Sequence, residues 1–228
     1  MEIENLQPKK KSKHRDKNPF APQWPFRVYM IGVTGSGKTN VLMNMLRKYL
    51  EYDTITIYAK EFDNDEKYIE FREMVEEIEE ELEQALSYFS TELGDKFIPL
   101  EEYCKDNQNI IVFDDFAADE RKEHKPVVET FIRGRHHNVS SFYLSQNLHA
   151  LPKSARMQCS MIIVFKGCND DDKRTLWKDH CSNVKWDEFD RLFHECTDPE
   201  HGFMVIDLKN HLLRIRKGFD QIYVPQKQ

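Results

Sequence analysis

Short runs of apolar residues recur along the chain and alternate with longer segments in which apolar residues stand three or four positions apart. Runs of the first kind predict buried strands, and spacings of the second kind predict helices with one apolar face. The runs that predict strands lie at Arg27–Ile31, Ile55–Tyr58, Ile110–Phe113, Val139–Leu144 and Met161–Phe165. This alternation is typical of an α/β fold with a doubly wound, mainly parallel sheet and helices on both faces.

Helical spacing fills the segments between these strands. The predicted helices run from the loop after the first strand to about Leu50, through an acidic segment at 61–83, and over Pro126–Arg133, Lys153–Gln158, Arg174–His180 and Trp186–Phe193. After the last helix, Phe203–Ile206 and Leu212–Ile215 flank the polar pair Lys209-Asn210. Two short apolar runs around a polar turn predict a C-terminal β-hairpin.

The segment from Glu61 to Glu83 concentrates negative charge. Twelve acidic and two basic residues give it −10, so the rest of the chain carries +3 of the total of −7. Its apolar residues form one stripe at helical spacing: Tyr68, Phe71, Val75, Ile78 and Leu82. The stripe fits an outer helix packed on the sheet or a helix that docks a partner, and packing is the favoured interpretation. Because nucleic-acid affinity depends on local charge, the acidic total leaves a DNA partner open.

A chain of 228 residues is long enough for one sizeable core, so residues 19–228 are expected to form a single domain. Residues 1–18 carry a basic run, Lys9 to Arg15, and are expected to be a disordered arm, with nuclear targeting or DNA contact as alternatives. No apolar run reaches the length of a membrane span, and no signal peptide is recognisable. Five cysteines without close pairing favour a reducing, intracellular compartment.

The first strand is joined to the first helix by the glycine-rich loop Gly32-Val33-Thr34-Gly35-Ser36-Gly37-Lys38-Thr39. It matches G-x-x-x-x-G-K-[ST] in the strand–loop–helix setting that this phosphate-binding motif needs. The glycines let backbone N–H groups wrap around phosphate oxygens, Lys38 reaches the β- and γ-phosphates, and the Thr39 hydroxyl helps to hold Mg²⁺. The residues expected to bind ATP are Gly32, Thr34, Gly35, Ser36, Gly37, Lys38, Thr39 and Asn40.

Two carboxylates directly follow the third predicted strand, in the run Ile-Ile-Val-Phe-Asp114-Asp115. A buried strand that ends in a carboxylate is the usual means by which a phosphate-loop protein holds Mg²⁺ opposite the loop hydroxyl. Asp114 is expected to contact the metal through water, and Asp115 to orient and deprotonate the attacking water. The alternative for each is a cap on the following turn.

An amide and three arginines complete the catalytic candidates. Gln146 follows the fourth strand, where an amide can contact both the γ-phosphate and the attacking water, and a turn-stabilising role is the alternative. Arg133, Arg135 and Arg156 are candidates for an arginine finger, which neutralises charge on the phosphoryl group held by a neighbouring subunit. Each of them fits equally well a cation at a helix C-terminus.

Cysteine and histidine residues gather in the C-terminal part of the chain, at Cys168, His180, Cys181, His194, Cys196 and His201. Their number suggests a zinc site, but no Cys-x-x-Cys pair is present and the spacings match no common structural site. Packed cysteines and surface histidines are the favoured interpretation.

Five segments occur in one order at spacings that resemble a known family. They are the phosphate loop, Ile-Ile-Val-Phe-Asp-Asp, Phe-Ile-Arg-Gly-Arg-His, Tyr-Leu-Ser-Gln-Asn and Leu-Pro-Lys-Ser-Ala-Arg. Together, from about Phe20 to Phe165, they look like the poxvirus type of genome-packaging ATPase of large double-stranded DNA viruses and virophages, which belongs with the FtsK and HerA DNA-pumping motors. The chain departs from the wider superfamily at Asp115, where glutamate is usual.

The resemblance implies a phosphate-loop NTPase fold of the additional-strand type, with the five core strands in the order 5-1-4-3-2. It also implies a homo-oligomeric ring with ATP at each subunit interface, which drives double-stranded DNA through a central channel into a capsid. Gln146 then corresponds to the sensor after the fourth strand, and one of the three arginines serves the neighbouring nucleotide.

The same resemblance implies capsid or portal-like partner proteins and no membrane. The expected location is the cytoplasm or nucleus of the host cell, at sites of virus assembly, or the virion itself. Channel-facing basic residues are expected to contact DNA phosphates without reading sequence. The candidates after the third strand are Arg121, Lys122 and Lys125.

Two other classes of function share the phosphate loop and the metal carboxylate. A monomeric kinase of a small molecule needs an arginine-bearing lid and a substrate pocket. The amide after the fourth strand and the extra strand expected between the loop strand and the metal strand argue against this class. The other class is a nucleotide-controlled binding module with slow hydrolysis.

Overall fold

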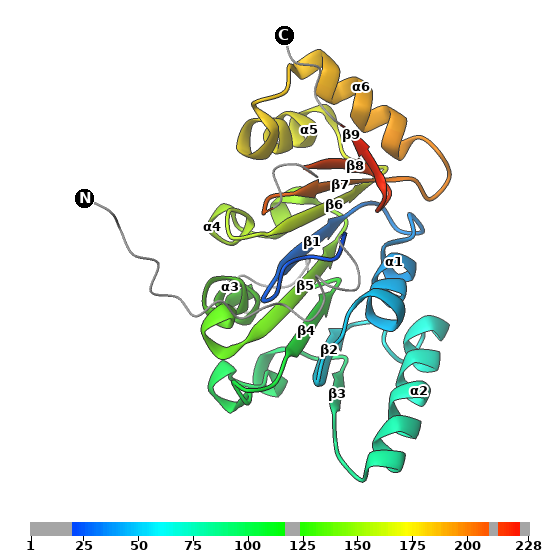
Figure 1. Ribbon diagram of the computed structural model, residues 1–228, viewed down its shortest axis with the longest axis vertical. Coiled ribbons are helices and arrows are strands. Elements are labelled where there is room, and N and C mark those ends of the chain that lie inside the picture. The colour runs from blue at the N-terminus through cyan, green and yellow to red at the C-terminus, as the bar shows by residue number, and fades with distance from the viewer. Residues whose placement is uncertain (1–19, 117–123, 210–213, 224–228) are drawn as a thin grey trace, which may run out of the picture.

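The computed structural model describes residues 20–116, 124–209 and 214–223 (Figure 1). The predicted basic arm at residues 1–18 lies outside this part of the chain. The strands are β1 (Arg27–Ile31), β2 (Thr54–Ala59), β3 (Ser87–Ser90), β4 (Asn109–Asp114), β5 (Val139–Ser145), β6 (Met161–Phe165), β7 (Phe203–Asp207), β8 (Ile215–Lys217) and β9 (Gln221–Tyr223). They form one sheet in the order β3-β2-β4-β5-β1-β6-β7-β8-β9.

This order confirms the predicted α/β fold. The five strands predicted from the apolar runs are β1, β2, β4, β5 and β6, and in the sheet they lie in the order β6-β1-β5-β4-β2, which is the expected 5-1-4-3-2. Neighbours within this group pair in parallel, because each is reached by a crossover that runs back along the sheet. The C-terminal strands β7, β8 and β9 pair antiparallel.

Three details of the sheet differ from the sequence pattern. The pattern does not predict β3, which pairs in parallel with β2 at one edge of the sheet and whose four residues are only half-buried. The predicted hairpin is present as β7 and β8. Strand β8 covers Ile215–Lys217 and so extends past the predicted end at Ile215, and residues 210–213 lie outside the described part. A further short strand, β9, follows and is mostly exposed.

Helices cover both faces of the sheet (Figure 1). They are α1 (Lys38–Asn44), α2 (Glu66–Leu82), α3 (His124–Arg133), α4 (Lys153–Arg156), α5 (Asp170–Leu176) and α6 (Trp186–Thr197). Helices α1 and α2 pack on one face, and α3 to α6 pack on the other. Helix α1 continues as a π-helical segment, Met45–Tyr49, so the predicted helix ending near Leu50 is confirmed.

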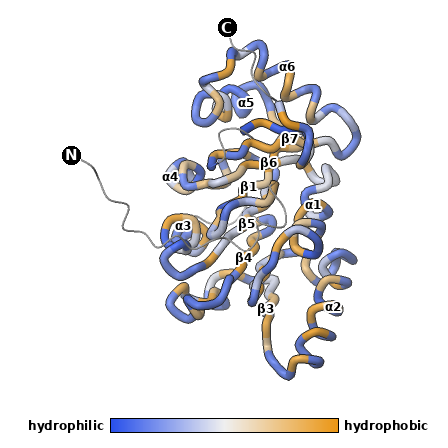
Figure 2. Tube along the Cα trace, viewed as in Figure 1, coloured by the Kyte–Doolittle hydropathy of each residue, from blue (hydrophilic) through white to orange (hydrophobic). Residues whose placement is uncertain are grey.

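The two faces of the sheet are filled by alternate residues of the same strands. In β1, Tyr29 and Ile31 join the core on the side of α3 to α6, whereas Val28 and Met30 join the core on the side of α1 and α2. Side chains of a strand point alternately to opposite faces, so a strand buried on both faces is apolar throughout. Figure 2 shows the hydrophobic colour concentrated along these central strands.

The acidic helix α2 packs against the sheet through only part of its apolar stripe. Tyr68, Phe71 and Val75 are buried, but Ile78 is 41% exposed and Leu82 is 60% exposed. Asp65 caps the helix, because its side chain accepts a hydrogen bond from the backbone N–H of Lys67. The predicted packing therefore holds for the first half of the helix, and the last turns lie off the core.

The register of the strands brings the candidate functional residues together at the carboxyl ends of the strands. Ala59 of β2 is aligned with Asp114 of β4, Asp114 with Leu144 of β5, and Ile31 of β1 with Ser145 of β5. The carboxyl ends of all four strands therefore meet where the phosphate loop begins, which is where ligands bind in such sheets. None of the helices in the described part of the chain combines the length and apolarity needed to cross a membrane.

Candidate active site

The phosphate loop makes its turn at two glycines in the left-handed region of backbone space. Gly35 has φ 75° and Gly37 has φ 103°, a conformation that costs glycine little and other residues more. Gly37 immediately precedes the first residue of α1, and the N–H of Val41 already bonds to the carbonyl of Gly37. The loop thus turns sharply from β1 into the start of α1, as the motif requires.

Lys38 lies across the loop. Its ammonium group donates hydrogen bonds to the carbonyl oxygens of Gly32 at 2.7 Å and Val33 at 3.1 Å. Burial lowers the pKa of Lys38, and the charges of Asp114 and Asp115 act in the opposite direction. A cation in this position offsets the negative charge of both carboxylates and stands beside the loop that is expected to hold phosphate.

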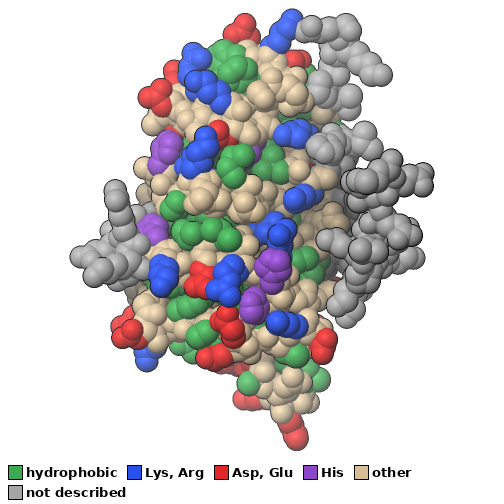
Figure 3. Space-filling model, turned by 90° about the vertical axis from the view of Figure 1, so that its left-hand side faces the viewer, with side chains coloured by type: hydrophobic (Ala, Val, Ile, Leu, Met, Phe, Trp, Pro, Cys, Tyr) green, Lys and Arg blue, Asp and Glu red, His purple; other side chains and the backbone are tan. Residues whose placement is uncertain are grey.

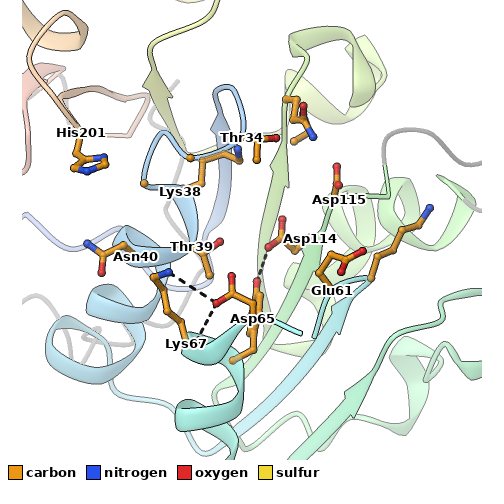
Figure 4. A pocket seen from close by; sticks show the side chains of 16 residues that line it. Thr34, Lys38, Thr39, Asn40, Glu61, Asp65, Lys67, Asp114, Asp115 and His201 are labelled. Atoms are coloured by element: carbon orange, nitrogen blue, oxygen red, sulfur yellow. Dashed lines mark hydrogen bonds and ion pairs between the residues drawn. The ribbon is translucent and has the colours of Figure 1, made fainter. Parts of the chain in front are cut away.

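A cavity of about 490 Å³ opens between the loop and the carboxyl ends of β2, β4 and β5 (Figure 4). The structure brings most of the predicted ligands together around it. Its lining includes Thr34, Gly35, Gly37, Lys38, Thr39, Asn40, Asp114, Asp115 and Gln146. Gly32 and Ser36 lie in the loop itself but outside the lining of this cavity.

Asp114 is held by a tyrosine from α2. The hydroxyl of Tyr68 donates a hydrogen bond to Oδ2 of Asp114 at 2.6 Å. Burial raises the pKa of Asp114 to about 6, against the lowering effects of the Tyr68 hydrogen bond and of Lys38. Burial and the Asp114 charge raise the pKa of the Tyr68 phenol, so the phenol remains a hydrogen-bond donor. A carboxylate whose charge is disfavoured by its surroundings is a group that a cation would stabilise.

Asp115 adds a second carboxylate at the end of β4. Its backbone adopts φ 61°, which is uncommon for a residue with a side chain. Its N–H bonds to the carbonyl of Leu144 at 3.3 Å, so the strand pairing continues to this residue. Two carboxylates and the Thr39 hydroxyl around one cavity are hard oxygen donors of the kind that Mg²⁺ takes. The residues present therefore fit a magnesium ion.

Gln146 lies at the rim of the cavity and is exposed. The buried hydroxyl of Tyr29 holds the segment around Gln146 in place. It lies 2.8 Å from Oγ of Ser145 and donates to the carbonyls of Asn147 and Leu148. The N–H of Gly32 bonds to the carbonyl of Ser145 at 3.1 Å. The end of β5 is thereby attached to the start of the phosphate loop.

The three candidate arginines lie away from this cavity. Helix α3 leads back to the start of β5, so Arg133 and Arg135 lie at the amino ends of the strands, and both are exposed. Arg133 forms ion pairs with Glu129 and Glu101. Arg156 is 4% exposed and donates to the carbonyls of Leu148 and Leu151. None of the three lines the cavity of its own chain.

Several residues line the cavity that the sequence pattern does not place there. Lys60 and Glu61 follow β2, Asp65, Lys67 and Tyr68 come from the start of α2, and His201 comes from the loop before β7. Figure 4 shows His201 on the far side of the loop from Asp114 and Asp115. The sequence signals for the α2 group are the apolar stripe, which begins at Tyr68, and the acidic cap Asp65 three residues before it.

A second cavity of about 400 Å³ adjoins the first. It shares Thr34, Gly35 and His201 with the first cavity and is otherwise lined by Val33 and Ser36 of the phosphate loop, by Lys166, and by residues 197–200 and 202 at and after the end of α6. His201 has φ 57°, and a Cβ on Gly37 would lie 3.5 Å from its Nδ1 atom. The imidazole therefore stands against the outer side of the phosphate loop.

The remaining candidates lie elsewhere. Lys125 is exposed on α3, and Arg121 and Lys122 lie outside the described residues. Cys159, Cys181 and Cys196 are buried free thiols. Within residues 20–116, 124–209 and 214–223, no three His, Cys, Asp or Glu side chains are grouped so that they could hold a metal ion.

Comparison with known proteins gives the family. A model of the family described as Poxvirus A32 protein matches residues 14–185, which is most of the chain. The chain belongs to this family. The A32 family is that of the poxvirus genome-packaging ATPases, so the resemblance drawn from the sequence motifs is confirmed and the protein is an ATPase. A search of curated proteins finds no match.

Solved structures of other proteins have a similar fold. The genome packaging NTPase B204 from Sulfolobus turreted icosahedral virus 2 in complex with AMPPCP is similar, with 15% identity, a TM-score of 0.58, and coverage of 87% of this chain and 97% of that chain. The cytoplasmic domain of the Thermomonospora curvata type VII secretion ATPase EccC is similar over 89% of this chain and 26% of that chain, with 14% identity and a TM-score of 0.52. At these identities the likeness shows a shared fold.

Proposed function

We propose that this protein is an ATP-driven translocase that pumps double-stranded DNA and packages a viral genome into a capsid. The observation that carries the proposal is the single cavity that joins the phosphate loop to the Asp114 carboxylate at the end of β4. B204, which shares the fold, is described as a DNA-packaging ATPase and has been solved with AMP, AMPPCP and ATP-gammaS. ATP and Mg²⁺ are therefore the proposed ligands of the cavity.

The two adjoining cavities suggest how the nucleotide lies. The triphosphate is proposed to follow the loop, with its γ-phosphate toward Asp114 and Asp115. The nucleoside end then extends past Gly35 toward Lys166 and His201 in the second cavity. The loop separates the two cavities, so a ligand that occupies both has to run along its backbone N–H groups.

Each side chain around the first cavity is proposed to have its own role in ATP hydrolysis. Lys38 leaves the carbonyls of Gly32 and Val33 for the phosphate oxygens and neutralises charge that develops on them. Thr39 and Asp114 would hold Mg²⁺, which when bound supplies charge neutralisation at the phosphate oxygens. Asp115 is proposed to orient the attacking water and accept its proton, and Gln146 to contact the γ-phosphate and that water.

A neighbouring subunit is proposed to complete the site. Arg133 and Arg135 are exposed at the amino ends of the strands, opposite the cavity, so neither reaches the nucleotide of its own chain. Figure 3 shows Lys, Arg and His side chains, with Asp and Glu among them, on the side of the molecule where α3 and α4 lie. In a head-to-tail ring, this face of one subunit meets the nucleotide edge of the next. Arg156 fits the role less well, because its guanidinium is buried against its own chain.

The DNA is proposed to pass through the centre of this ring and to be held by its phosphates, without recognition of sequence. Lys125 at the start of α3 is the described candidate for such a contact. The further partners expected for a packaging motor are capsid or portal-like proteins. The proposed location is a site of virus assembly in the host cell, in the cytoplasm or nucleus, or the virion.

The test is the rate of ATP hydrolysis with and without duplex DNA, together with the mass of the protein in solution. A motor is stimulated strongly by duplex DNA, a small-molecule kinase is not, and a nucleotide-controlled binding module responds weakly. Lys38→Ala serves as the control, since it is expected to abolish turnover while the fold remains intact. A rate that duplex DNA leaves unchanged would contradict the motor, and a rate that Lys38→Ala leaves unchanged would contradict the site.

A further inference from the structure

One buried tyrosine connects helix α2 to the metal side of the cavity. Tyr68 lies in the first turn of α2, and its hydroxyl donates to Oδ2 of Asp114 at 2.6 Å. The dashed line that reaches Asp114 in Figure 4 marks this bond. The two residues are 46 positions apart in the chain, so the contact joins two separate elements, α2 and β4.

The surroundings fix the hydroxyl in this position. Tyr68 is 1% exposed, and its ring packs against that of Phe62 with 5.2 Å between ring centroids. Asp65 caps the helix just before it. A phenol held by such packing loses little further freedom when it makes its hydrogen bond. A short hydrogen bond to a carboxylate is also about twice as strong as one between neutral groups.

We infer that Tyr68 is a positioning residue for Asp114 and that helix α2 is thereby coupled to the metal–nucleotide site. The inference rests on the proposed function, because that proposal assigns Asp114 to Mg²⁺. The tyrosine occupies Oδ2 and leaves Oδ1 for a water ligand of the metal. A carboxylate without this partner rotates about its Cβ–Cγ bond and presents a less fixed ligand. Partners that orient metal ligands in this way typically account for 10–100-fold in metal affinity.

The coupling extends to a surface with a strong charge. The start of α2 contributes Asp65, Lys67 and Tyr68 to the cavity wall, while the rest of the helix carries most of the chain's excess negative charge. Coupling between two sites is reciprocal, so metal binding at Asp114 steadies the start of α2, and any contact that displaces α2 weakens the metal site. Tyr68 is the described residue through which both effects pass.

The test compares Tyr68→Phe with Tyr58→Phe, each of which removes one buried hydroxyl. The hydroxyl of Tyr58 on β2 accepts from the N–H of Ile98 at 2.8 Å and lies outside the cavity. Binding of a fluorescent ATP analogue is measured against Mg²⁺ concentration and in EDTA. Tyr68→Phe should raise the Mg²⁺ concentration for half-maximal binding about tenfold and leave binding in EDTA unchanged. Tyr58→Phe should lower the melting temperature without moving the Mg²⁺ dependence.

The outcomes separate this inference from the proposed function. A Mg²⁺-dependent wild type with an identical Tyr68→Phe variant would overturn the role of Tyr68 alone. A wild type whose binding ignores Mg²⁺ would overturn the metal site of the proposed function. If Tyr68→Phe does not fold, hydrogen exchange of the wild-type chain decides: residues at the start of α2 should exchange more slowly with Mg²⁺ and the analogue than with the analogue in EDTA. Equal exchange would overturn the coupling.

Discussion

At the scale of single residues, the proposed role of Asp114 conflicts with its surroundings. To hold the proposed metal ion the carboxyl would have to be ionised, yet its burial favours the neutral form and raises its pKa to about 6. Lys38 and the hydroxyl of Tyr68 offset part of this effect. Because the Asp114 anion is incompletely stabilised in the free chain, a bound cation would stabilise it strongly. The lower stability of the free chain and the proposed affinity for metal would then have the same cause.

The raised pKa gives a prediction for stability. Because the folded state binds this proton more tightly than the unfolded state, protonation of Asp114 favours folding. This stabilisation is fully present below about pH 4, where the carboxyl is neutral in both the folded and the unfolded state, and it is lost as the pH rises through about 6. Asp114→Asn removes the charge, so in EDTA at pH 8 it should be more stable than the wild type by about 1–3 kcal/mol. The gain should shrink toward pH 5. Urea unfolding at both values measures it, and a variant less stable at pH 8 would contradict the account.

Asp115, the proposed base, shares the cavity with a second candidate carboxylate, Glu61. Asp115→Asn keeps a hydrogen-bonding side chain and should retain nucleotide binding while turnover falls by about 10²–10⁴-fold. Glu61→Gln is the matched change at the end of β2 and should retain most of the turnover. Single-turnover hydrolysis with bound radiolabelled ATP measures both. The reverse pattern would assign the base to Glu61, and loss of binding in Asp115→Asn would mean that Asp115 is structural.

The sequence pattern identifies the residues that follow strands β1, β4 and β5 but misses those supplied by α2 and by the loop before β7. The phosphate loop, Asp114 and Gln146 are recognisable because their chemistry is tied to a motif or to a strand end. Tyr68 appears in the sequence as the first apolar residue of an amphipathic stripe, which predicts its burial and says nothing of its hydroxyl. His201 reaches the loop through the antiparallel strand β7, whose position beside β6 is not encoded in any local spacing.

At the scale of elements, local patterns identify the five core strands but not the edge strands β3 and β9, and the order of the core strands is implied only by the family resemblance. Strands buried on both faces are largely apolar, and their apolar runs identify β1, β2, β4, β5 and β6. The edge strand β3 is a Tyr-Phe pair between two serines and takes its structure from pairing with β2. Helix α2 is less well packed toward its end, where Ile78 is 41% exposed and Leu82 is 60% exposed. Tertiary contacts decide these edges, and local propensity does not.

The junction between β1 and the phosphate loop gives a prediction for one element. A Cβ on Gly32 would lie 2.6 Å from Cβ of Phe165 in β6 and 2.8 Å from Oγ of Ser36. The first of these atoms cannot move without its backbone, so Gly32→Ala should shift the loop away from β6. We expect a loss of about 1–3 kcal/mol in stability and a clear loss of ATP affinity, measured by calorimetry. Wild-type affinity would show that the loop position is not critical.

At the scale of the whole molecule, the sheet separates two kinds of surface. One edge holds the nucleotide cavity, and the opposite edge carries exposed Arg133 and Arg135 with no nucleotide site of their own. The proposed head-to-tail ring would bring these two ends of the strands together at every interface. In that ring, the distance between the arginines and the cavity within one chain would be spanned by the neighbouring subunit.

Mixing of variants tests this arrangement. Arg133→Ala and Arg135→Ala are each expected to slow turnover, by about 10³-fold or more for the true finger, and Lys38→Ala is inactive by itself. An equimolar mixture of the finger variant with Lys38→Ala should recover part of the activity, because some interfaces then pair an intact loop with an intact arginine. Arg156→Ala provides the comparison, as its buried guanidinium predicts a loss of stability that mixing does not rescue. No recovery with any arginine variant would contradict a finger supplied in trans.

The most direct test of the central claim is displacement of the third strand from a DNA triplex. A chain that translocates along duplex DNA should strip the third strand when ATP and Mg²⁺ are present. It should not do so with a non-hydrolysable analogue, and Lys38→Ala should be inactive under all conditions. If the wild-type protein binds the duplex and hydrolyses ATP while the third strand stays in place, hydrolysis is not coupled to movement and the account of this protein as a DNA motor is wrong.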